Sequence, residues 1–456
     1  MALKSISLRG FRNLEPTSVD FVEGSNYLFG PNGAGKTNLL EAIHYLAIGR
    51  SFRRCPDADM LGFGKDVLAV SGTDEGGDTA EIRFDGREKR ILRNNIPVEK
   101  LSEYFGWLPV VVLLLEDIEL VRGAPGIRRN FLDVAIAKAE GGRRKTEDGR
   151  RSEEQSYIAL TGEYRRAVSQ YNRLLERSGA SREPVADQLS AWEEELVLSG
   201  VPVYEARLAK VGGLLENAAR HYERLAGHGA AFSYRSSIVS EGTRAVGTGH
   251  DPKSQASEGT RSEIVGGGQP PALKAPQSGT VPTISVMSPL DLAAAFRQRL
   301  AATRERARAL GHAVVGPHRD DIRITRGERE LRKFGSVGEQ RLAGIALRLA
   351  EADMILSAGR QRPVFLLDEV ASELDEQRSR MVLEMVAERG QMVYAAARRM
   401  APPHEGSRDR GIEGSSDGPQ STAHDASALD HLTTGPLDHF SGKEFHVEAG
   451  KVSQVS

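Results

Sequence analysis

The alternation of apolar and polar residues near the start of the chain predicts a strand, a glycine loop and a helix in succession. Residues 6–11 alternate as a half-buried strand does, and residues 26–29 are a second short strand candidate. Residues 38–48 then carry leucine and isoleucine at the three- and four-residue spacing of one helix face. A strand that leads through glycines into a helix is typical of an α/β unit.

The middle of the chain changes character, because arginine and glutamate become frequent and helical periodicity replaces the strand pattern. Three segments show this periodicity: residues 163–177, 186–198 and 203–225. We expect them to form separate helices of an antiparallel helical arm of modest length.

Three tracts lack periodicity and carry few large apolar residues: residues 141–152, 240–285 and 401–436. The pentapeptide Ser-Glu-Gly-Thr-Arg occurs twice within or beside the second tract, at residues 240–244 and 257–261. Two such copies are too short to be units of a solenoid. We interpret the tracts as disordered insertions, the second grown by local duplication.

Globular patterning resumes after the second tract. The pattern predicts helices at residues 290–309 and 340–356, buried strands at 364–367 and 391–397, and hairpins at 321–333 and around residues 445–452.

Composition and charge narrow the class of protein. The chain has 456 residues and a net charge of −2, so any nucleic-acid contact must come from a local basic patch. The longest apolar run, residues 110–115, is too short for a membrane span, and residues 1–11 lack the apolar core of a signal peptide. Cys55 is the only cysteine, which excludes an intrachain disulfide. These features predict a cytoplasmic protein.

A complete phosphate loop follows the second predicted strand. Its pattern, G-x-x-x-x-G-K-[ST], is matched by Gly30, Pro31, Asn32, Gly33, Ala34, Gly35, Lys36 and Thr37. Glycines let successive backbone N–H groups turn toward one anion, and the following helix adds its positive N-terminal end. We expect Lys36 to bind the β- and γ-phosphates, the Thr37 hydroxyl to ligate Mg²⁺, and Asn38 to touch phosphate or cap the helix.

Two acids end the buried strand at residues 364–367. In open α/β folds the carboxyl end of a strand lies at the edge where ligands bind. We expect Asp368 to hold Mg²⁺ and Glu369 to orient and polarise the attacking water, as the catalytic residue. The alternative is an ordinary solvated turn after a core strand.

A candidate second anion site lies at residues 335–340, just before the predicted helix. Ser336, Gly338 and Gln340 resemble the signature of ABC ATPases, which binds the γ-phosphate held by the other subunit. The alternative is an ordinary serine cap with Glu339 as its partner. The signature lies far from the phosphate loop in sequence, unlike in transporter ATPases, and the intervening helices are too short for the coiled coil of an SMC protein.

Further motifs resemble those of the RecF family of bacterial recombination mediators. They are Phe11–Leu14, residues 30–38, Gly49–Arg53, Arg128–Asp133, Gly316–Asp321 and Asp368–Asp375. The resemblance implies an α/β fold: an ABC-type P-loop ATPase head, with a mixed sheet and flanking helices, plus a short helical arm. The head would comprise residues 1–136 and 311–456, and the arm residues 137–310.

The resemblance also implies a function. ATP, with Mg²⁺, would drive homodimerisation on single-stranded DNA and on junctions between single- and double-stranded DNA, and slow hydrolysis would release the DNA. RecO and RecR would be partners in loading the recombinase, with roles in gap repair, DNA replication and the SOS response, in the cytoplasm at the nucleoid. Residues 393–397 lack the histidine that often follows this strand in transporter ATPases, so we expect a weak, DNA-stimulated ATPase. Glu116 is the candidate nucleotide-sensing residue.

Basic residues beside an aromatic one are the candidate DNA contacts. Arg50, Arg53 and Arg54 surround Phe52, and the predicted arm carries further arginines. Such contacts would be independent of DNA sequence and sensitive to salt. The alternative for each group is a solvated surface whose charges pair with neighbouring acids.

Two other functions remain open. The chain could be an ATPase subunit that drives a membrane or other protein partner, which co-fractionation with membranes would support. It could also be an SMC-like tether that uses ATP only to dimerise and has no preference for DNA junctions. A kinase is excluded, because His318–Asp320 is followed by Thr325 where a kinase catalytic loop needs asparagine.

Overall fold

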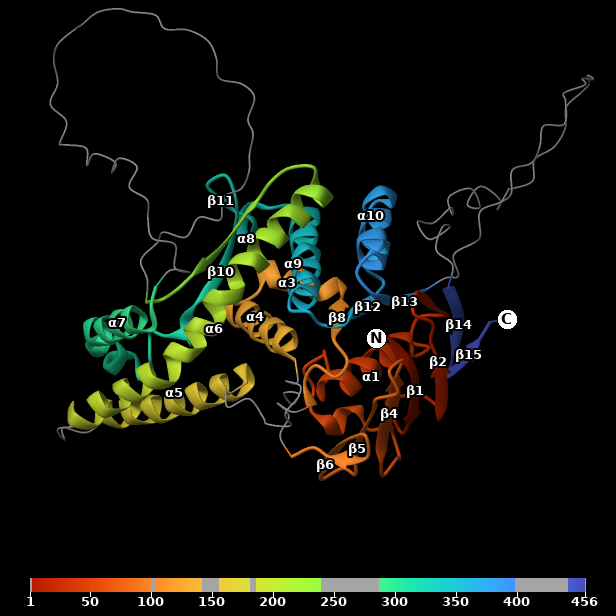
Figure 1. Ribbon diagram of the computed structural model, residues 1–456, viewed down its shortest axis with the longest axis horizontal. Helices are drawn as coiled ribbons and strands as arrows, with labels where there is room; N and C mark the ends of the chain where they lie inside the picture. Colours follow the sequence, from red (N-terminus) through yellow and green to blue (C-terminus); the bar gives the residue numbers. More distant parts are fainter. Residues whose placement is uncertain are drawn as a thin grey trace, which may run out of the picture.

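The computed structural model describes residues 2–99, 104–141, 156–180, 186–238, 287–397 and 442–455 (Figure 1). The predicted insertions at 240–285 and 401–436 lie outside the described residues, as does the tract 141–152 apart from Gly141. None of the described helices combines the length and the apolar character that crossing a bilayer requires.

The central sheet combines strands from both ends of the chain, in the order β15-β14-β3-β13-β12-β8. Its strands are β3 (Ser25–Phe29), β8 (Val110–Leu113), β12 (Val364–Asp368), β13 (Gln391–Ala396), β14 (Gly442–Glu448) and β15 (Lys451–Gln454). All neighbouring pairs are parallel except β14 and β15, which form the predicted closing hairpin. The mixed α/β sheet confirms the predicted fold class.

A second, antiparallel sheet lies on the other side of α1 (Lys36–Ile48), in the order β2-β1-β4-β5-β6-β7. Its strands are β1 (Leu3–Arg9), β2 (Thr17–Asp20), β4 (Leu68–Asp74), β5 (Thr79–Phe84), β6 (Lys89–Arg93) and β7 (Ile96–Pro97). Because α1 contacts both sheets, nearly all of its residues are buried. Its apolar residues, which include Leu39, Leu40, Ile43 and Leu46, pack into the core between the two sheets.

Long helices form the arm on the opposite side of the molecule (Figure 1). They are α5 (Tyr157–Ala180), α6 (Ala186–Ala226) and α7 (Pro289–Leu310), while α4 (Pro125–Glu140) packs between α5, α6 and the helix that follows the candidate signature. The prediction of separate helices at 186–198 and 203–225 is wrong, because α6 runs through Pro202. Proline removes one helix hydrogen bond, but here Val203 and Tyr204 are fully buried, and Tyr204 packs edge-on against Phe296 of α7. Packing therefore holds the helix together across the proline.

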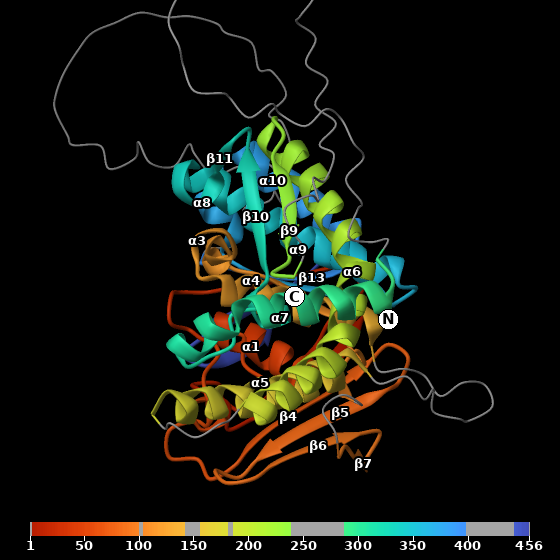
Figure 2. The same ribbon diagram turned by 90° about the vertical axis from the view of Figure 1, so that its left-hand side faces the viewer.

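A third, small sheet joins the arm to the helix that follows the candidate signature (Figure 2). Its order is β11-β10-β9, with β9 (Ala231–Arg235), β10 (Asp321–Arg326) and β11 (Arg329–Glu330). The predicted hairpin at 321–333 is shorter than expected, because the chain turns into α8 (Leu331–Phe334), where Leu331 is buried. The remaining helices are α3 (Glu119–Arg122), α9 (Val337–Ser357) and α10 (Glu376–Ala387), with 3-10 turns at Asp57–Met60, Leu115–Ile118, Pro317–Arg319 and Val370–Glu373.

Candidate functional site

The phosphate loop leaves β3 at Gly30 and enters α1 at Lys36. Gly30 has a φ of 152°, and a Cβ there would lie 1.9 Å from the Val447 carbonyl oxygen, so only glycine fits. The loop is also held from the far end of the chain, since the Gly450 N–H donates to the Ala34 carbonyl at 2.9 Å. The β14–β15 hairpin thus fixes the shape of the loop.

Lys36 lies over the loop rather than in solvent. Its Nζ donates to the Gly30 carbonyl at 2.7 Å and to the Pro31 carbonyl at 3.1 Å. Burial lowers the pKa of Lys36, and the negative charges of Glu369 and Asp368 oppose that shift. The loop carbonyls therefore hold a cation at the phosphate loop, where an anionic phosphate would bind.

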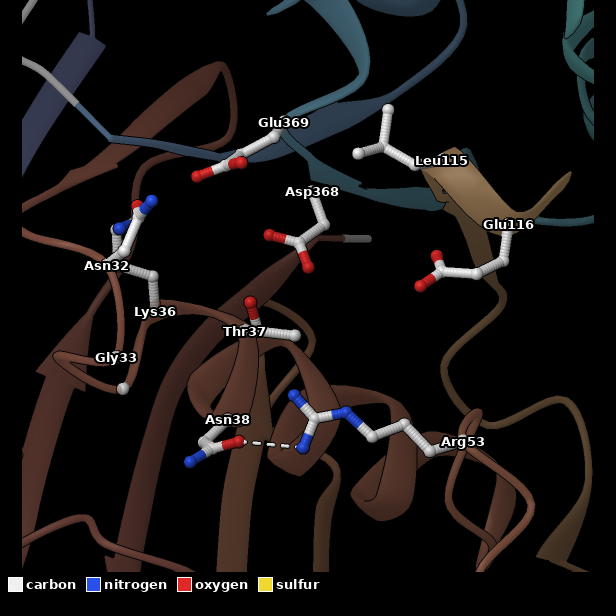
Figure 3. Close-up of a pocket in the computed structure, with 11 residues that line it drawn as sticks. Asn32, Gly33, Lys36, Thr37, Asn38, Arg53, Leu115, Glu116, Asp368 and Glu369 are labelled. Carbon is white, nitrogen blue, oxygen red and sulfur yellow. Dashed lines mark hydrogen bonds between the residues drawn. The ribbon is translucent and has the colours of Figure 1, made fainter.

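The acid pair faces this loop across the sheet. Because β13 lies between β3 and β12, Asp368 at the end of β12 reaches the floor of the same pocket, where it faces Thr37 (Figure 3). Burial raises the pKa of Asp368, while a hydrogen bond with Thr37 opposes the shift. These are the two oxygens that the sequence predicts for Mg²⁺.

Glu369 has an unusual backbone conformation. Its φ is 51°, which a non-glycine residue adopts at a cost, and its N–H donates to the Ala395 carbonyl at 3.0 Å. The left-handed turn directs its carboxylate over the pocket beside Asp368 (Figure 3). Strain of this kind gathers at functional sites, where surrounding structure maintains it.

The loop and the acids line one open pocket of about 290 Å³. Its walls are Asn32, Gly33, Gly35, Lys36, Thr37, Asn38, Arg53, Leu115, Glu116, Asp368 and Glu369. Glu116 enters from the turn that follows β8, opposite the phosphate loop (Figure 3). The structure therefore brings Glu116 to the site for which the sequence proposed it.

Of the three arginines predicted to contact DNA, only Arg53 lines the nucleotide pocket. Arg53 lines the pocket, where its Nη1 donates to Asn38 Oδ1 at 2.9 Å and to Glu41 Oε2 at 3.1 Å. Arg50 and Arg54 are exposed and are not among the pocket residues. The position of Arg53 thus places its charge beside the phosphate loop.

Sequence reasoning missed Glu41, the fully buried acid that holds this arrangement. Both of its oxygens accept from Arg12, at 2.8 and 3.0 Å, and one of them also accepts from Arg53. Asn13 continues the support, because it accepts from Asn38 at 2.7 Å and donates to the Gly33 carbonyl at 3.2 Å. The only available signal was an acidic residue within the helix that follows the phosphate loop.

The candidate signature does not line this pocket. Ser336 caps α9: its hydroxyl accepts from the Glu339 N–H at 3.2 Å, and its own N–H donates to Glu339 Oε2 at 2.8 Å. Ser336 and Gly338 are exposed at this helix end. Gln340 is buried and donates to the Leu331 carbonyl at 2.7 Å, so its side chain supports the turn from inside.

Oxygen ligands suit a hard cation such as Mg²⁺, and the pocket offers the Thr37 hydroxyl and the Asp368 carboxylate side by side. Within the described residues, no group of three or more histidine, cysteine, aspartate or glutamate side chains is arranged to hold a metal ion without a substrate. The site therefore fits a cation that binds together with phosphate oxygens.

A parallel-stranded sheet, a complete phosphate loop and an acid pair two strands away define a P-loop ATPase head of the ABC type. A family model described as an AAA domain matches residues 5–178. The chain is 30% identical over 396 residues to the DNA replication and repair protein RecF of Geobacillus kaustophilus, covering 86% of this chain and 91% of that protein. It is 31% identical to RecF of Symbiobacterium thermophilum, covering 85% and 89%. The chain belongs to the RecF family.

A solved structure described as the recombination mediator protein RecF-ATPrS in the RecFOR pathway has the same fold. The match has a TM-score of 0.72 and 22% identity, and covers all of this chain and 98% of the other. A RecF-ATP structure matches equally well, with a TM-score of 0.72 and 21% identity. These likenesses confirm the predicted fold class.

Proposed function

We propose that this chain is an ATP-dependent DNA-binding protein of recombinational repair, and that it dimerises on ATP. The observation that carries the proposal is the single pocket in which Lys36 and Thr37 face Asp368 and Glu369, while Ser336 lies outside it. One head thus offers a nucleotide site and, separately, an exposed helix end for a second nucleotide. The relatives of this chain are named as DNA replication and repair proteins, which supports DNA as the partner.

The phosphate loop holds the nucleotide in this proposal. Backbone N–H groups of residues 30–37 and the N-terminal end of α1 stabilise the phosphate charge, and Lys36 exchanges its loop carbonyls for phosphate oxygens. Arg53 and Asn38, which are bonded to one another, extend the positive wall. Mg²⁺, when bound by Thr37 and Asp368 with the nucleotide, would neutralise phosphate charge.

Glu369 is the proposed catalytic residue. Its carboxylate stands over the pocket beside Asp368, where it can accept a hydrogen bond from water and orient that water toward the terminal phosphate. Residues 393–397, on and after β13, supply no histidine to assist it. We therefore expect slow hydrolysis that acts as a switch and is stimulated by DNA.

The exposed signature would complete the pocket of a second copy. Ser336 and Gly338 present a hydroxyl and N–H groups at the N-terminal end of a long helix, which suits a phosphate held by the partner. Gln340, being buried, is a positioning residue for this turn rather than a direct contact. ATP would then hold two heads together, and its hydrolysis would release them.

The finer parts of the proposal follow from family membership. They are preference for single-stranded DNA and its junctions with duplex, cooperation with RecR and RecO, recombinase loading, gap repair and the SOS response. A cytoplasmic protein associated with the nucleoid is consistent with these roles.

The mass of the Glu369→Gln variant in solution tests the proposed dimerisation on ATP. This variant should keep ATP unhydrolysed, so light scattering with ATP and Mg²⁺ should give twice the monomer mass, and ADP should not. The control is Lys36→Ala in the Glu369→Gln background, which should stay monomeric because it cannot hold the phosphates. A monomer with ATP, when ATP binding is separately measured, would contradict dimerisation by nucleotide alone.

A further inference from the structure

A second cavity lies on the lobe that carries the signature, away from the nucleotide pocket. Its volume is about 210 Å³, and its lining residues come from α3, α4, β9, β10, β11 and α8. Figure 2 shows these elements close together. Its charged lining consists of Arg128, Arg235, Arg323, Arg332, Asp321 and Glu330. We call this cavity the arginine groove. Four arginines against two carboxylates make it positive in a chain whose net charge is −2.

The floor of the groove is formed by a buried ion pair. Arg128, which is 3% exposed, donates from Nε and Nη2 to the two oxygens of Asp321 at 2.7 and 2.9 Å. Its remaining nitrogen donates to the Gly123 carbonyl at 2.9 Å. Above this floor, Arg323 Nε lies 2.6 Å from Glu330 Oε1. Both carboxylates of the groove are thus already engaged by arginines of the groove.

Two exposed arginines complete the rim. Arg235 comes from β9, directly across from Asp321 in the sheet, and Arg332 comes from the first turn of α8. Four separate elements, α4, β9, β10 and α8, therefore bring guanidinium groups to one hollow. The planar guanidinium fork matches the oxygens of a phosphate, which makes arginine the preferred side chain for binding nucleic-acid backbone.

The groove offers charge without an apolar anchor. Its apolar residues Val121, Ile322 and Ile324 are each buried, at 3%, 4% and 5% exposure. A protein partner usually needs a central apolar or aromatic contact, whereas the phosphate backbone of DNA binds through charge alone. We propose that the arginine groove holds the phosphate backbone of DNA. This proposal rests on the proposed function, because DNA is taken as the partner.

The groove is connected to the signature through α8. Arg332 lies in this short helix, and Gln340 of α9 donates to the carbonyls of Leu331, at 2.7 Å, and of Gly335, at 3.1 Å. A phosphate held by Arg332 therefore acts on the same turn that presents Ser336. This arrangement supplies a route by which bound DNA alters the position of the signature.

The test removes the rim and leaves the floor intact. The variant is Arg235→Ala with Arg332→Ala, since both side chains are exposed and Arg128 keeps its structural bonds. The matched control is Arg87→Ala with Arg90→Ala, two exposed arginines around the β5–β6 turn of the other sheet. Fluorescence anisotropy with ATP would follow a labelled random 30-base-pair duplex and a labelled thirty-residue oligo-dT between 50 and 200 mM salt.

We expect the rim variant to bind duplex at least tenfold more weakly at 100 mM salt. We also expect the slope of log binding constant against log salt concentration to become less steep by about 1.8, because each duplex phosphate contact contributes about 0.9 to that slope. Binding of a fluorescent ATP analogue and the melting temperature should match those of the control. If the rim variant binds duplex with the same affinity and the same salt slope as the control, the proposal that the groove binds DNA is overturned, while the proposed function stands. A wild-type chain that binds neither DNA would overturn the proposed function itself.

Discussion

Arg348 and Asp117 join the signature helix to the wall of the nucleotide pocket. Two guanidinium nitrogens of Arg348, on α9, donate to Asp117 Oδ1 at 2.9 and 2.8 Å. Asp117 directly follows Glu116, which lines the pocket. Arg348 also donates to Glu351 at 3.0 Å, and Glu351 accepts from Lys138 at 2.6 Å. A buried network of alternating charges thus links α4, α9 and the turn after β8.

Removing Arg348 should strongly destabilise the chain. Arg348→Met leaves two carboxylates, Asp117 and Glu351, facing the single cation Lys138 in the interior. Breaking a buried ion pair on one side costs about 3–5 kcal/mol of unfolding free energy. Urea unfolding monitored by circular dichroism measures that loss.

A surface pair provides the matched control for this prediction. Arg378 pairs with Asp375 at 2.7 Å, and both side chains are about half exposed, at 43% and 51%. Arg378→Met should therefore cost about 1 kcal/mol or less. Equal losses in the two variants would show that the buried network contributes no more than a surface contact.

Alanine substitutions at Arg53 and at Arg54 should affect nucleotide binding differently. Arg53 lines the pocket and Arg54 does not. We expect Arg53→Ala to weaken binding of an ATP analogue by about tenfold, or about 1.4 kcal/mol, because a charge beside the phosphates is lost. Arg54→Ala should bind the analogue as wild type does. If Arg53→Ala instead lost DNA and kept the nucleotide, the DNA contact predicted from the sequence would stand.

Two glycines of the phosphate loop should respond differently to alanine. At Gly33, with φ at 80°, a Cβ would have no atom within 4 Å, so the cost of Gly33→Ala is the backbone strain, about 1–2 kcal/mol. At Gly30 a Cβ would overlap the Val447 carbonyl. We expect Gly30→Ala to lose clearly more stability in urea unfolding, because β14 must move. Similar losses would mean that the hairpin does not hold the loop.

The chemistry-bearing part of the site could be predicted because it is local in sequence. The glycines of the phosphate loop, Lys36 and Thr37 lie in one continuous segment. Asp368 and Glu369 can be recognised because they directly follow one buried strand. Strand, loop and helix periodicity placed both motifs correctly on the sheet. The sheet order then brought them together, as parallel topology requires.

The supporting contacts could not be predicted because they join distant segments. Glu41 gathers Arg12 and Arg53 from two loops, and nothing in a single sequence pairs them. The inward position of Gln340 depends on α8, at residues where the sequence pattern predicts a hairpin strand instead. Pro202 predicts a helix break by propensity, and only the packing of its neighbours overrides it.

His318 is held neutral by the packing of the arm against the head. Its Nδ1 lies 2.6 Å from the Tyr164 hydroxyl and its Nε2 lies 3.3 Å from the Ala313 carbonyl. The carbonyl can only accept, so Nε2 carries the proton and Nδ1 accepts from Tyr164. Burial lowers the pKa of His318 to about 4.

The chain should therefore lose stability in mild acid. The unfolded state takes up a proton near pH 6.5, whereas folded His318 resists protonation down to about pH 4, so its contribution is present above pH 6.5 and falls below it. The loss approaches about 1.4 kcal/mol per pH unit within that window. His318→Gln should show a shallower decline in unfolding free energy between pH 6.5 and pH 4.5, measured in urea. His446→Gln, a partly exposed position on β14, is the control, and a decline unchanged in His318→Gln would refute this assignment.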